Sequence, residues 1–590
     1  MPEINSTDKS KLGESMSTME ESECPDKPQN LNIGEPNLRS DFLRQRQDSV
    51  PSLTLTEKFC YGVGHVFNDL CASMWFSYLL LFFEKVLLFP DTLAGVVLLV
   101  GQLADGISTP IVGVLSDMEN KIPACARYGR RKIWHLVGTV CVTISFPFIF
   151  SPAYGLEDAS LTAQSIYYCC FVIVFQFGWA SVQISHLALI PDLTPKKSLR
   201  TELNSIRYAF TVLANLSVFT ITFFILGSGS TSDGDSSMST PAMDSIWKTS
   251  STSVPDSAIS INGSCSASDT SLEPSDLNNF RTIALVCVVL GLIFSAIFHV
   301  GVKEPEFQCP KKREGSGSRM RKIDWFKQFP FYLVAVLYMA TRLYVNLYQV
   351  YIPLFVQDTI CLAKTAVATV PFTMYLAGFF GSLVMKKLNK VIGRKGTFAT
   401  GCVIGLLGCT WTYAAGPEYA DYFKVWGIFV VAVLLGSGGS TLLITSLSIT
   451  ADLIGNNTEG GAFVYGLMSL VDKFSNGIII MIIQDSNTGD PMYYRDVIFY
   501  ACGGACVVGL ITTIALIPIK VHRRRGVAKS VISLMDGNAD DSSDSGSDSS
   551  ITLPSKKQLS GEVNEAADIV DTICGSLEKE APIKHPRAIV

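Results

Sequence analysis

Apolar residues along this chain occur in blocks of roughly 20, separated by short polar or charged segments. A helix of about 20 apolar residues crosses the roughly 30 Å hydrocarbon core of a bilayer, because each residue adds about 1.5 Å. The pattern predicts an all-α membrane protein with twelve transmembrane helices, over residues 58–86, 92–115, 132–151, 163–190, 203–227, 280–300, 330–356, 365–386, 397–415, 424–452, 460–484 and 496–518.

Composition agrees with a membrane protein. Hydrophobic residues make up 48% of the chain and charged residues only 17%, whereas soluble domains average about 25% charged residues. The 16 cysteines lie mostly in the apolar blocks and lack the spacing of zinc ligands. We therefore expect them to behave as small apolar side chains, with no metal site and no disulfide framework.

Positive charge is distributed unequally between alternate loops. The loops after the second, fourth, sixth and eighth predicted spans hold 21 Lys and Arg residues, and the loops on the other side hold 4. Because cytosolic loops carry the excess of positive charge, both termini are predicted to be cytosolic. Residues 1–57 and 519–590 are polar and predicted to be disordered tails. The loop 228–279 then lies on the luminal or outer side, where the sequon at Asn262 is predicted to be glycosylated.

Two motifs occur once in each half of the chain. The loop after the second span ends in "YGRRK" (128–132), and the loop after the eighth contains "IGRK" (392–395). The fourth span ends in "PDL" and the tenth in "ADL". We therefore expect two homologous six-helix bundles, residues 58–300 and 330–518, joined by a basic cytosolic linker, 301–329. Two such bundles that rock around a site at the middle of the membrane form an alternating-access transporter.

Five of the predicted spans carry polar residues at helical spacing. An ionisable side chain in the middle of a bilayer costs about 2.5–3.5 kcal/mol, so each one needs a cavity or a partner. Residues three, four or seven apart share one helix face, so each set contains a stripe, formed in the last set by Lys473 and Asn476. The sets are His65, Asn68 and Asp69; Asp105 and Thr109; Gln176, Gln183 and His186; Arg342, Asn346 and Gln349; and Asp472, Lys473 and Asn476.

The segment "GVLSDMENKIPACARYGRRK", residues 113–132, resembles the signature of the major facilitator superfamily. Its extended interval before the glycine, and "YGVGHVFND" in the first span, resemble the glycoside-pentoside-hexuronide:cation symporter branch, which includes the melibiose carriers. Segments such as "FQFGWASVQISHLALIPDL" and "GAFVYGLMSLVDKFSNG" resemble one family of this superfamily over residues 58–520. That resemblance implies import of cysteine from the cytosol into lysosomes or melanosomes.

The same resemblance implies roles for the charged residues. Asp105 matches an aspartate that binds the coupling cation in melibiose-type carriers, but Thr109 and Gln183 stand where those carriers have two further carboxylates. Because sodium prefers several oxygen ligands, a lone carboxylate is better suited to exchange a proton. Asp69 matches a substrate-binding aspartate, and Lys473 matches a lysine close to the cation site.

Charge complementarity extends this predicted binding site. Arg342, beside Asn346 on its stripe, could bind a carboxylate through two parallel hydrogen bonds. Asp69 or Asp105 could bind the ammonium group of an amino acid. Asn476 shares a helix face with Lys473 and is included among the binding residues.

A second set of residues is predicted to hold the cytosolic side closed and to release it as the bundles rock. These gating residues are Asp117, Gly129, Arg130, Arg131 and Arg394.

Three functions remain open from the sequence. The first is a monomeric secondary transporter of cysteine, coupled to a proton. The second is a cation-coupled carrier of sugars or other small polar solutes, and the third is a non-transporting receptor or scaffold, which would not need polar stripes. An enzyme is excluded because no nucleophile–base pair, metal cluster or phosphate-binding loop occurs. No cofactor and no nucleic-acid partner are expected. Neither tail contains an acidic dileucine signal, so the plasma membrane remains an alternative to the lysosomal or melanosomal membrane.

Overall fold

The computed structural model describes residues 53–117, 128–194, 196–228, 271–305, 322–414, 422–455 and 461–519. These residues contain no strand, and eleven of their helices are long and apolar enough to cross a membrane. The predicted segment 397–415 is not one of the eleven but forms the second part of α13 (Ala366–Ala414), which is interrupted by a non-helical residue, Gly393. The predicted fold class, an all-α membrane protein, is confirmed.

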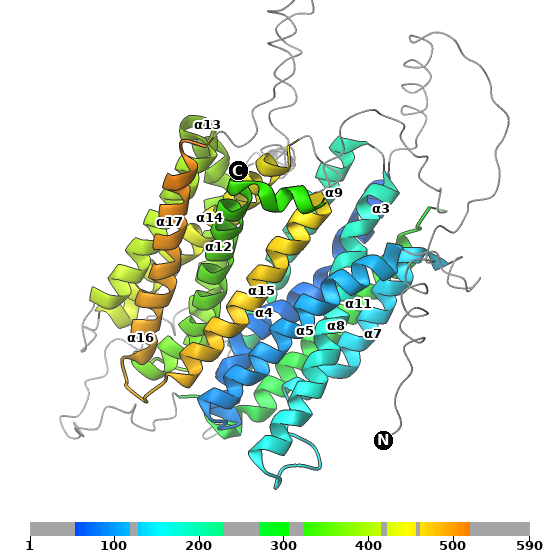
Figure 1. Cartoon of the computed structure of the whole chain (residues 1–590). Coiled ribbons are helices and arrows are strands. Elements are labelled where there is room, and N and C mark those ends of the chain that lie inside the picture. The colour runs from blue at the N-terminus through cyan, green and yellow to red at the C-terminus, as the bar shows by residue number, and fades with distance from the viewer. Residues whose placement is uncertain are drawn as a thin grey trace, which may run out of the picture. The chain divides into compact units, whose positions relative to one another are not determined.

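The helices follow one another in two series (Figure 1). The first series is α3 (Leu55–Val63), α4 (Val66–Leu81), the π-helical turn η1 (Phe82–Val86), α5 (Asp91–Asp117), α7 (Arg130–Ile149), α8 (Leu161–Leu193), α9 (Lys197–Ser228), the 3₁₀ turn η3 (Pro274–Asp276) and α11 (Leu277–Gly301). The second is the 3₁₀ turn η4 (Lys322–Lys327), α12 (Phe329–Leu354), the π turn η5 (Phe355–Thr359), α13, the π turn η6 (Phe423–Gly427), α14 (Ile428–Ile454), α15 (Gly461–Asp485), α16 (Tyr493–Val497), the π turn η8 (Ile498–Cys502) and α17 (Gly503–Leu516).

The first membrane span is broken into α3 and α4 by local sequence signals. Thr54 caps α3: its side chain accepts a hydrogen bond from the backbone N–H of Glu57, and the Glu57 carboxylate accepts one from the Thr54 N–H. Gly64 then ends α3 where a Cβ would meet the ring of Phe298 at 2.5 Å and His186 Nε2 at 2.8 Å. Glycine therefore allows α8 and α11 to approach the break closely.

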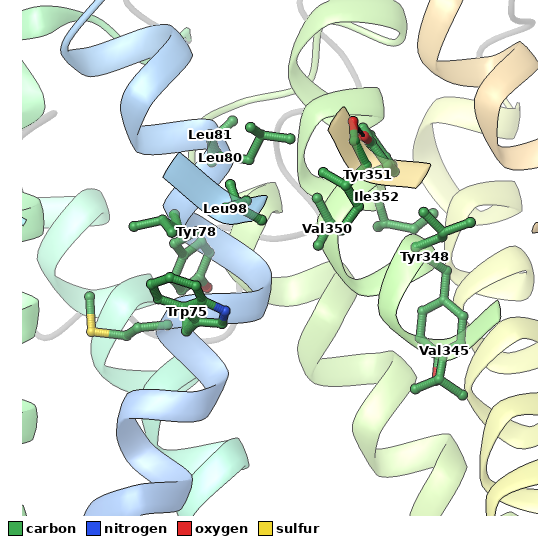
Figure 2. Packing of buried hydrophobic residues seen from close by; sticks show 14 of the residues in the cluster. Trp75, Tyr78, Leu80, Leu81, Leu98, Val345, Tyr348, Val350, Tyr351 and Ile352 are labelled. Carbon is green, nitrogen blue, oxygen red and sulfur yellow. Dashed lines mark hydrogen bonds between the residues drawn. The ribbon is translucent and has the colours of Figure 1, made fainter. Parts of the chain in front are cut away.

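The hydrophobic core lies where the two series meet. The apolar part of the first span is 89% buried and that of the seventh 61%, more than in any other span of the described chain. Helices α4 and α12 contact each other, and Figure 2 shows part of their shared cluster, with Trp75 and Tyr78 from α4 and Tyr348 and Tyr351 from α12. Most other spans present exposed apolar side chains, as expected for helices that face lipid.

The first and seventh spans end in the same backbone conformation. This repeat is additional to the Gly–Arg and "DL" motifs found in the sequence. Each span ends in a five-residue π turn, η1 or η5. A non-glycine residue with positive φ follows each turn at the same distance, Leu88 (55°) and Cys361 (57°). Asp69 lies thirteen residues before the start of η1, and Arg342 lies thirteen before the start of η5. The two charged residues therefore occupy equivalent positions in the two series.

One cysteine departs from the sequence expectation. Cys361 is disulfide-bonded, whereas the cysteines of the apolar helices, such as Cys402 and Cys502, carry free thiols. Its partner lies outside the described residues. The expectation of no disulfide was wrong because Cys361 lies in a connection between helices rather than inside an apolar helix.

Helices α13 and α14 approach closely at Gly436, where an added Cβ would lie 2.0 Å from the carbonyl oxygen of Met374. Because this neighbour is backbone, the helices must separate to admit a methyl group. We expect Gly436→Ala to destabilise the protein by about 1–3 kcal/mol, measured as a lower thermal unfolding midpoint in detergent. Gly466→Ala is the matched control, since nothing lies within 4 Å of its added Cβ. Equal loss of stability in both variants would contradict the argument.

Candidate functional site

A cavity of about 380 Å³ lies between α4 and α9 of the first series and α12, α13 and α14 of the second. Its wall combines apolar residues, such as Phe76, Met374 and Phe379, with polar ones. The polar lining residues are Asp69, Tyr208, Thr211, Asn215, Arg342, Asn346, Tyr348, Gln349, Tyr375 and Ser440. The volume suits a small solute rather than a macromolecule.

Asp69 is the acidic residue of this wall. Its Oδ1 atom lies 3.0 Å from Nδ1 of His65, and its Oδ2 atom accepts a hydrogen bond from Thr211 Oγ1 at 2.8 Å. Asp69 and His65 are both buried. The carboxylate is therefore oriented by one neighbour on its own span and one on α9.

Arg342 is the basic residue of the same wall. Its Nε atom donates to Asp472 Oδ2 at 2.9 Å, and Asn476 Nδ2 donates to the other carboxylate oxygen at 2.7 Å. The Asp472 side chain is 3% exposed, but that of Arg342 is 32% exposed. The guanidinium is thus held by α15 while part of it remains accessible in the cavity.

The predicted residues of the second span form a separate cluster with α15, outside the lining of this cavity. Lys473 Nζ lies 2.6 Å from Asp105 Oδ1 and donates to Thr109 Oγ1 at 2.8 Å. Thr109 in turn donates to Asp105 Oδ1 at 3.1 Å. The ion pair joins the two series, because α5 belongs to the first and α15 to the second.

The glycines of α5 and α15 indicate that these helices are close together near the ion pair and farther apart beyond it. A Cβ on Gly95 or Gly106 would touch α15, whereas a Cβ on Gly113 of α5 or Gly466 of α15 would meet nothing within 4 Å. The two helices therefore separate toward the ends that carry Asp117 and Gly461. We call this end of the protein the basic end, because the Arg130 and Arg394 motifs also lie there.

The structure brings the predicted binding residues together only in part. Asp69, Arg342 and Asn346 line one cavity, while Asp105, Thr109 and Lys473 form the cluster above. Asn476 binds Asp472, and the Gln183 side chain accepts a hydrogen bond from Trp179 Nε1 at 3.1 Å. The sequence missed the contributions of α9, α13 and α14, because these spans contribute uncharged polar residues. A signal was present in the Thr and Asn of "RYAFTVLAN".

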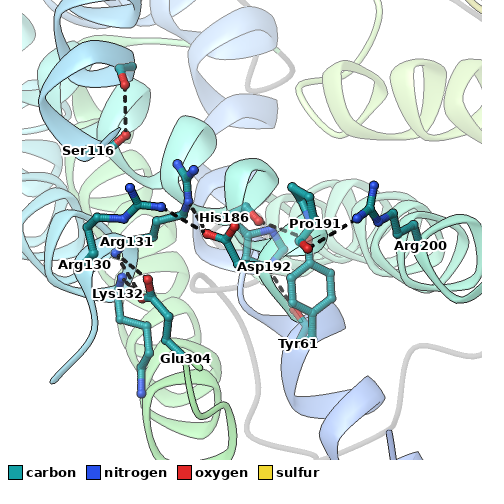
Figure 3. A network of polar contacts seen from close by, with 11 residues as sticks. Tyr61, Ser116, Arg130, Arg131, Lys132, His186, Pro191, Asp192, Arg200 and Glu304 are labelled. Carbon is teal, nitrogen blue, oxygen red and sulfur yellow. Dashed lines mark hydrogen bonds and ion pairs between the residues drawn. The ribbon is translucent and has the colours of Figure 1, made fainter. Parts of the chain in front are cut away.

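At the basic end, the predicted gating arginines bind the aspartate of the "PDL" motif (Figure 3). Arg131 Nε lies 2.6 Å from Asp192 Oδ2, and an Arg130 guanidinium nitrogen lies 3.5 Å from the same oxygen. Glu304 accepts hydrogen bonds from the backbone N–H groups of Arg131 and Lys132, which begin α7. A carboxylate is favoured at this helix end by the helix dipole. Gly129 has φ +121°, and its Cβ would collide with Glu304.

The second series repeats this arrangement. Gly393 has φ +73°, and Arg394 pairs with Asp452 of the "ADL" motif and donates to the Ser448 carbonyl at 3.0 Å. Lys395 donates to the carbonyls of Leu516, the last residue of α17, and Ile519, just as Lys132 donates to those of His299 and Val302 at the end of α11. Burial lowers the pKa of Lys395, and the Asp452 carboxylate opposes that shift. The Asp117 side chain and Asn262 lie outside the described residues.

At the opposite end, at least six polar contacts join the two series. Each links a residue between Glu84 and Asp276 to one between Asp358 and Tyr494. They include Lys85–Asp358 at 2.7 Å, Tyr494–Glu84 at 2.7 Å, Asn487–Asp91 at 2.7 Å, Lys364–Asp276 at 3.2 Å, Thr92–Asp485 at 3.2 Å and Gln484–Glu84. The protein is therefore tied together at this end.

Two equivalent helical bundles with a polar cavity between them, and matching Gly–Arg clusters at one end, define a multi-pass membrane transporter of the major facilitator fold rather than an enzyme. The chain belongs to the major facilitator superfamily, since the family described as MFS/sugar transport protein matches residues 60–484.

Comparison with individual proteins agrees. A protein of Mus musculus named Major facilitator superfamily domain-containing protein 12 is 39% identical over 494 residues, which cover 80% of this chain and 96% of that protein. An uncharacterized symporter of Synechocystis is 36% identical over 172 residues, covering 28% of this chain and 30% of the symporter. The inward-open xylose transporter of E. coli shares the fold with a TM-score of 0.52, at 12% identity, over 81% of this chain and 98% of its own.

Proposed function

We propose that this protein imports cysteine from the cytosol into lysosomes or melanosomes by alternating access. The observation that carries the proposal is the pair Asp69 and Arg342, which have opposite charges, occupy equivalent positions in the two bundles and line one small cavity. An amino acid presents an ammonium group and a carboxylate. Asp69 binds the first, and the guanidinium of Arg342 binds the second.

The apolar part of the cavity wall suits the side chain of cysteine. Phe76, Met374 and Phe379 line it beside the two charged groups. A thiol packs favourably against thioether and aromatic side chains. Asn346 and Asn215 supply further hydrogen-bonding groups within the same wall.

The proposed orientation places the basic end in the cytosol. The excess of Lys and Arg at that end supports this side. The disulfide at Cys361 supports the opposite end as luminal, because disulfides persist in oxidising compartments rather than in the cytosol. In this orientation the contacts of the opposite end close the luminal side, and the separation of α5 from α15 is on the cytosolic side.

We propose a proton as the coupling ion. Asp105 is paired with Lys473 and Thr109, and no second carboxylate joins this cluster in the described part of α5 or α15. This set is poor for sodium, which needs several oxygen ligands and compensation of its charge. A proton on Asp105 would instead cancel its attraction to Lys473 and loosen the contact between the bundles.

The test is uptake into vesicles that contain the purified full-length protein. Labelled cysteine, cystine and melibiose are compared, each with a pH gradient, with a sodium gradient and with neither. We expect uptake of cysteine that changes with the pH gradient but not with a sodium gradient. Vesicles without protein and vesicles with Asp69→Asn protein are the controls.

Melibiose tests the second candidate function, a cation-coupled sugar carrier. This function is favoured by the match to a family of sugar transport proteins. If the protein took up melibiose but not cysteine, the sugar-carrier function would replace the first proposal. No uptake of either solute would overturn both transport proposals.

A further inference from the structure

All four histidines of the described chain gather in the first bundle, between the basic end and the cavity. They come from four helical segments: His65 at the start of α4, His135 in α7, His186 in α8 and His299 in α11. His65, His135 and His186 are buried, and His299 is partly exposed near the basic end. Four titratable rings gathered inside a membrane protein are unusual and mark a candidate functional site.

Hydrogen bonds connect the members of this set that lie nearest the basic end. Tyr128 Oη lies 2.8 Å from His299 Nδ1, His299 Nε2 lies 3.0 Å from His135 Nδ1, and His135 Nε2 lies 2.9 Å from the Gly64 carbonyl oxygen. A carbonyl only accepts, so His135 Nε2 carries a proton. The remaining donors then follow: His299 Nε2–H donates to His135, and the Tyr128 hydroxyl donates to His299. Burial raises the pKa of Tyr128, which keeps that hydroxyl protonated.

His186 and His65 continue the set from His135 toward the cavity. The ring centroids of His135 and His186 are 6.0 Å apart, and those of His186 and His65 are 5.7 Å apart. His186 Nε2 donates to the Tyr61 carbonyl oxygen at 2.8 Å, which leaves Nδ1 as an acceptor. That atom and both ring nitrogens of His65 are buried without a hydrogen-bond partner in the described chain, and His65 Nδ1 approaches Asp69 as an ion-pair contact. Water bound to His186 Nδ1 and His65 Nε2 would satisfy them and join the rings.

We propose that these residues form a proton path, the histidine file, between the cytosolic basic end and Asp69 in the cavity. The inference rests on the proposed function, because it assigns Asp69 to the substrate ammonium and the basic end to the cytosol. The file ends at His65 Nδ1, which is 3.0 Å from the Asp69 carboxylate.

One proton is transferred at each step, and no other reactant is consumed. A proton accepted at His299 Nδ1 lets the Nε2 proton pass to His135 Nδ1. The Nε2 proton of His135 then leaves through water held at His186 Nδ1 and reaches His65 Nε2. His65 finally releases its Nδ1 proton to Asp69. The reverse sequence carries a proton from Asp69 to the cytosol. It starts with the ring proton on Nε2 of His65 and on Nδ1 of His135 and His299, so each ring returns to that tautomer between one outward passage and the next.

The charged residues around the file favour a proton that passes along the histidine rings rather than one that stays bound to them. Arg207 of α9 interacts electrostatically with His65, His186 and Tyr61. Lys132 acts on His135 and His299 from the outer side. Asp69 is the anion that faces His65. Two cations along the route disfavour a proton held on the rings, so a proton passes through the file in the direction set by the difference in pH between its two ends.

This path gives the transporter the direction that an acidic lumen requires. A proton taken up by Asp69 from the lumen displaces the ammonium of cysteine. After the bundles rock, the file releases that proton to the cytosol and restores the carboxylate for the next substrate. Cysteine and protons then move in opposite directions, so the proton gradient drives import.

The first test needs no substrate. Purified full-length protein is moved rapidly from pH 5 to pH 7.5 with a pH-sensitive dye in weak buffer, and proton release is followed. We expect Asp69→Asn to remove one component of the release and His135→Gln to slow the same component at least about tenfold. His299→Gln, nearer the surface, is the second variant in case His135→Gln does not fold. His522→Gln, outside the described residues, is the matched control and should match the wild type.

A second measurement separates this inference from the cysteine proposal. The ratio of cysteine uptake driven by an inside-acid gradient to cysteine exchange at equal pH is expected to fall at least about tenfold in His135→Gln. Wild-type protein without any cysteine exchange would overturn the cysteine proposal, while the pH-jump rates would still decide on the file. Equal release rates in wild type, His135→Gln and His299→Gln would overturn the histidine file.

Discussion

Asp105→Asn is expected to raise the unfolding equilibrium constant of the protein about 100-fold and to reduce transport. The change leaves the Lys473 ammonium buried without its counter-ion, and losing one partner of a buried ion pair costs about 3–5 kcal/mol. The two side chains retain 12% and 11% exposure, so we take the lower end, about 3 kcal/mol, which shifts an equilibrium constant about 100-fold. Cysteine exchange and the unfolding midpoint are the measurements.

The double variant Asp105→Asn/Lys473→Met separates a structural role from a functional one. Replacing a whole buried ion pair is often neutral for stability, because no uncompensated charge remains. We therefore expect the double variant to recover the unfolding midpoint but not gradient-driven uptake. If transport recovered along with stability, the ion pair would serve packing alone. Wild-type uptake by the single variant would remove Asp105 from the mechanism.

The sequence predicted those contacts that depend on local spacing. Asp105 and Thr109 were predicted to share a helix face, and their side chains form a hydrogen bond. The partner, Lys473, lies 368 residues from Asp105, so no periodicity could pair them. Only the resemblance to cation-coupled carriers placed this lysine near the aspartate.

The twelve apolar blocks were predictable because helices that cross lipid must be apolar. The residues that line a cavity are harder to recognise in the sequence. A hydroxyl can be satisfied within its own helix, as Thr211 Oγ1 shows by also contacting the Arg207 carbonyl. Such a residue costs little in an apolar span and does not stand out. Thr211 and Asn215 were missed for this reason, whereas the ionisable Asp69 and Arg342 were noticed.

The repeated motifs identified the charged residues of the basic end but not which of these residues pair with one another. The two Gly–Arg clusters were recognised as equivalent, and so were the two "DL" motifs, but their pairing became visible only in the fold. The histidines show the same limit. His65 and His186 belong to different stripes, and only the packing of four helical segments brings them close to His135.

Arg342→Lys is expected to weaken the binding of cysteine about 10- to 100-fold, because a charge-assisted hydrogen bond contributes about 1.5–3 kcal/mol. Lysine keeps the positive charge beside Asp472 but cannot present two parallel N–H groups to a carboxylate. The measurement is competition against labelled cysteine by unlabelled cysteine, by cysteamine, which lacks the carboxylate, and by 3-mercaptopropionate, which lacks the ammonium group.

The two analogues assign each charged residue to one end of the substrate. In the wild type, cysteine should compete better than either analogue. Arg342→Lys should remove the advantage of cysteine over cysteamine, and Asp69→Asn should remove its advantage over 3-mercaptopropionate. The exchanged pattern would mean that the substrate lies the other way round in the cavity. If cysteine kept its full advantage over cysteamine in Arg342→Lys, the carboxylate would be bound elsewhere, and the opposite charges of Asp69 and Arg342 would no longer explain recognition.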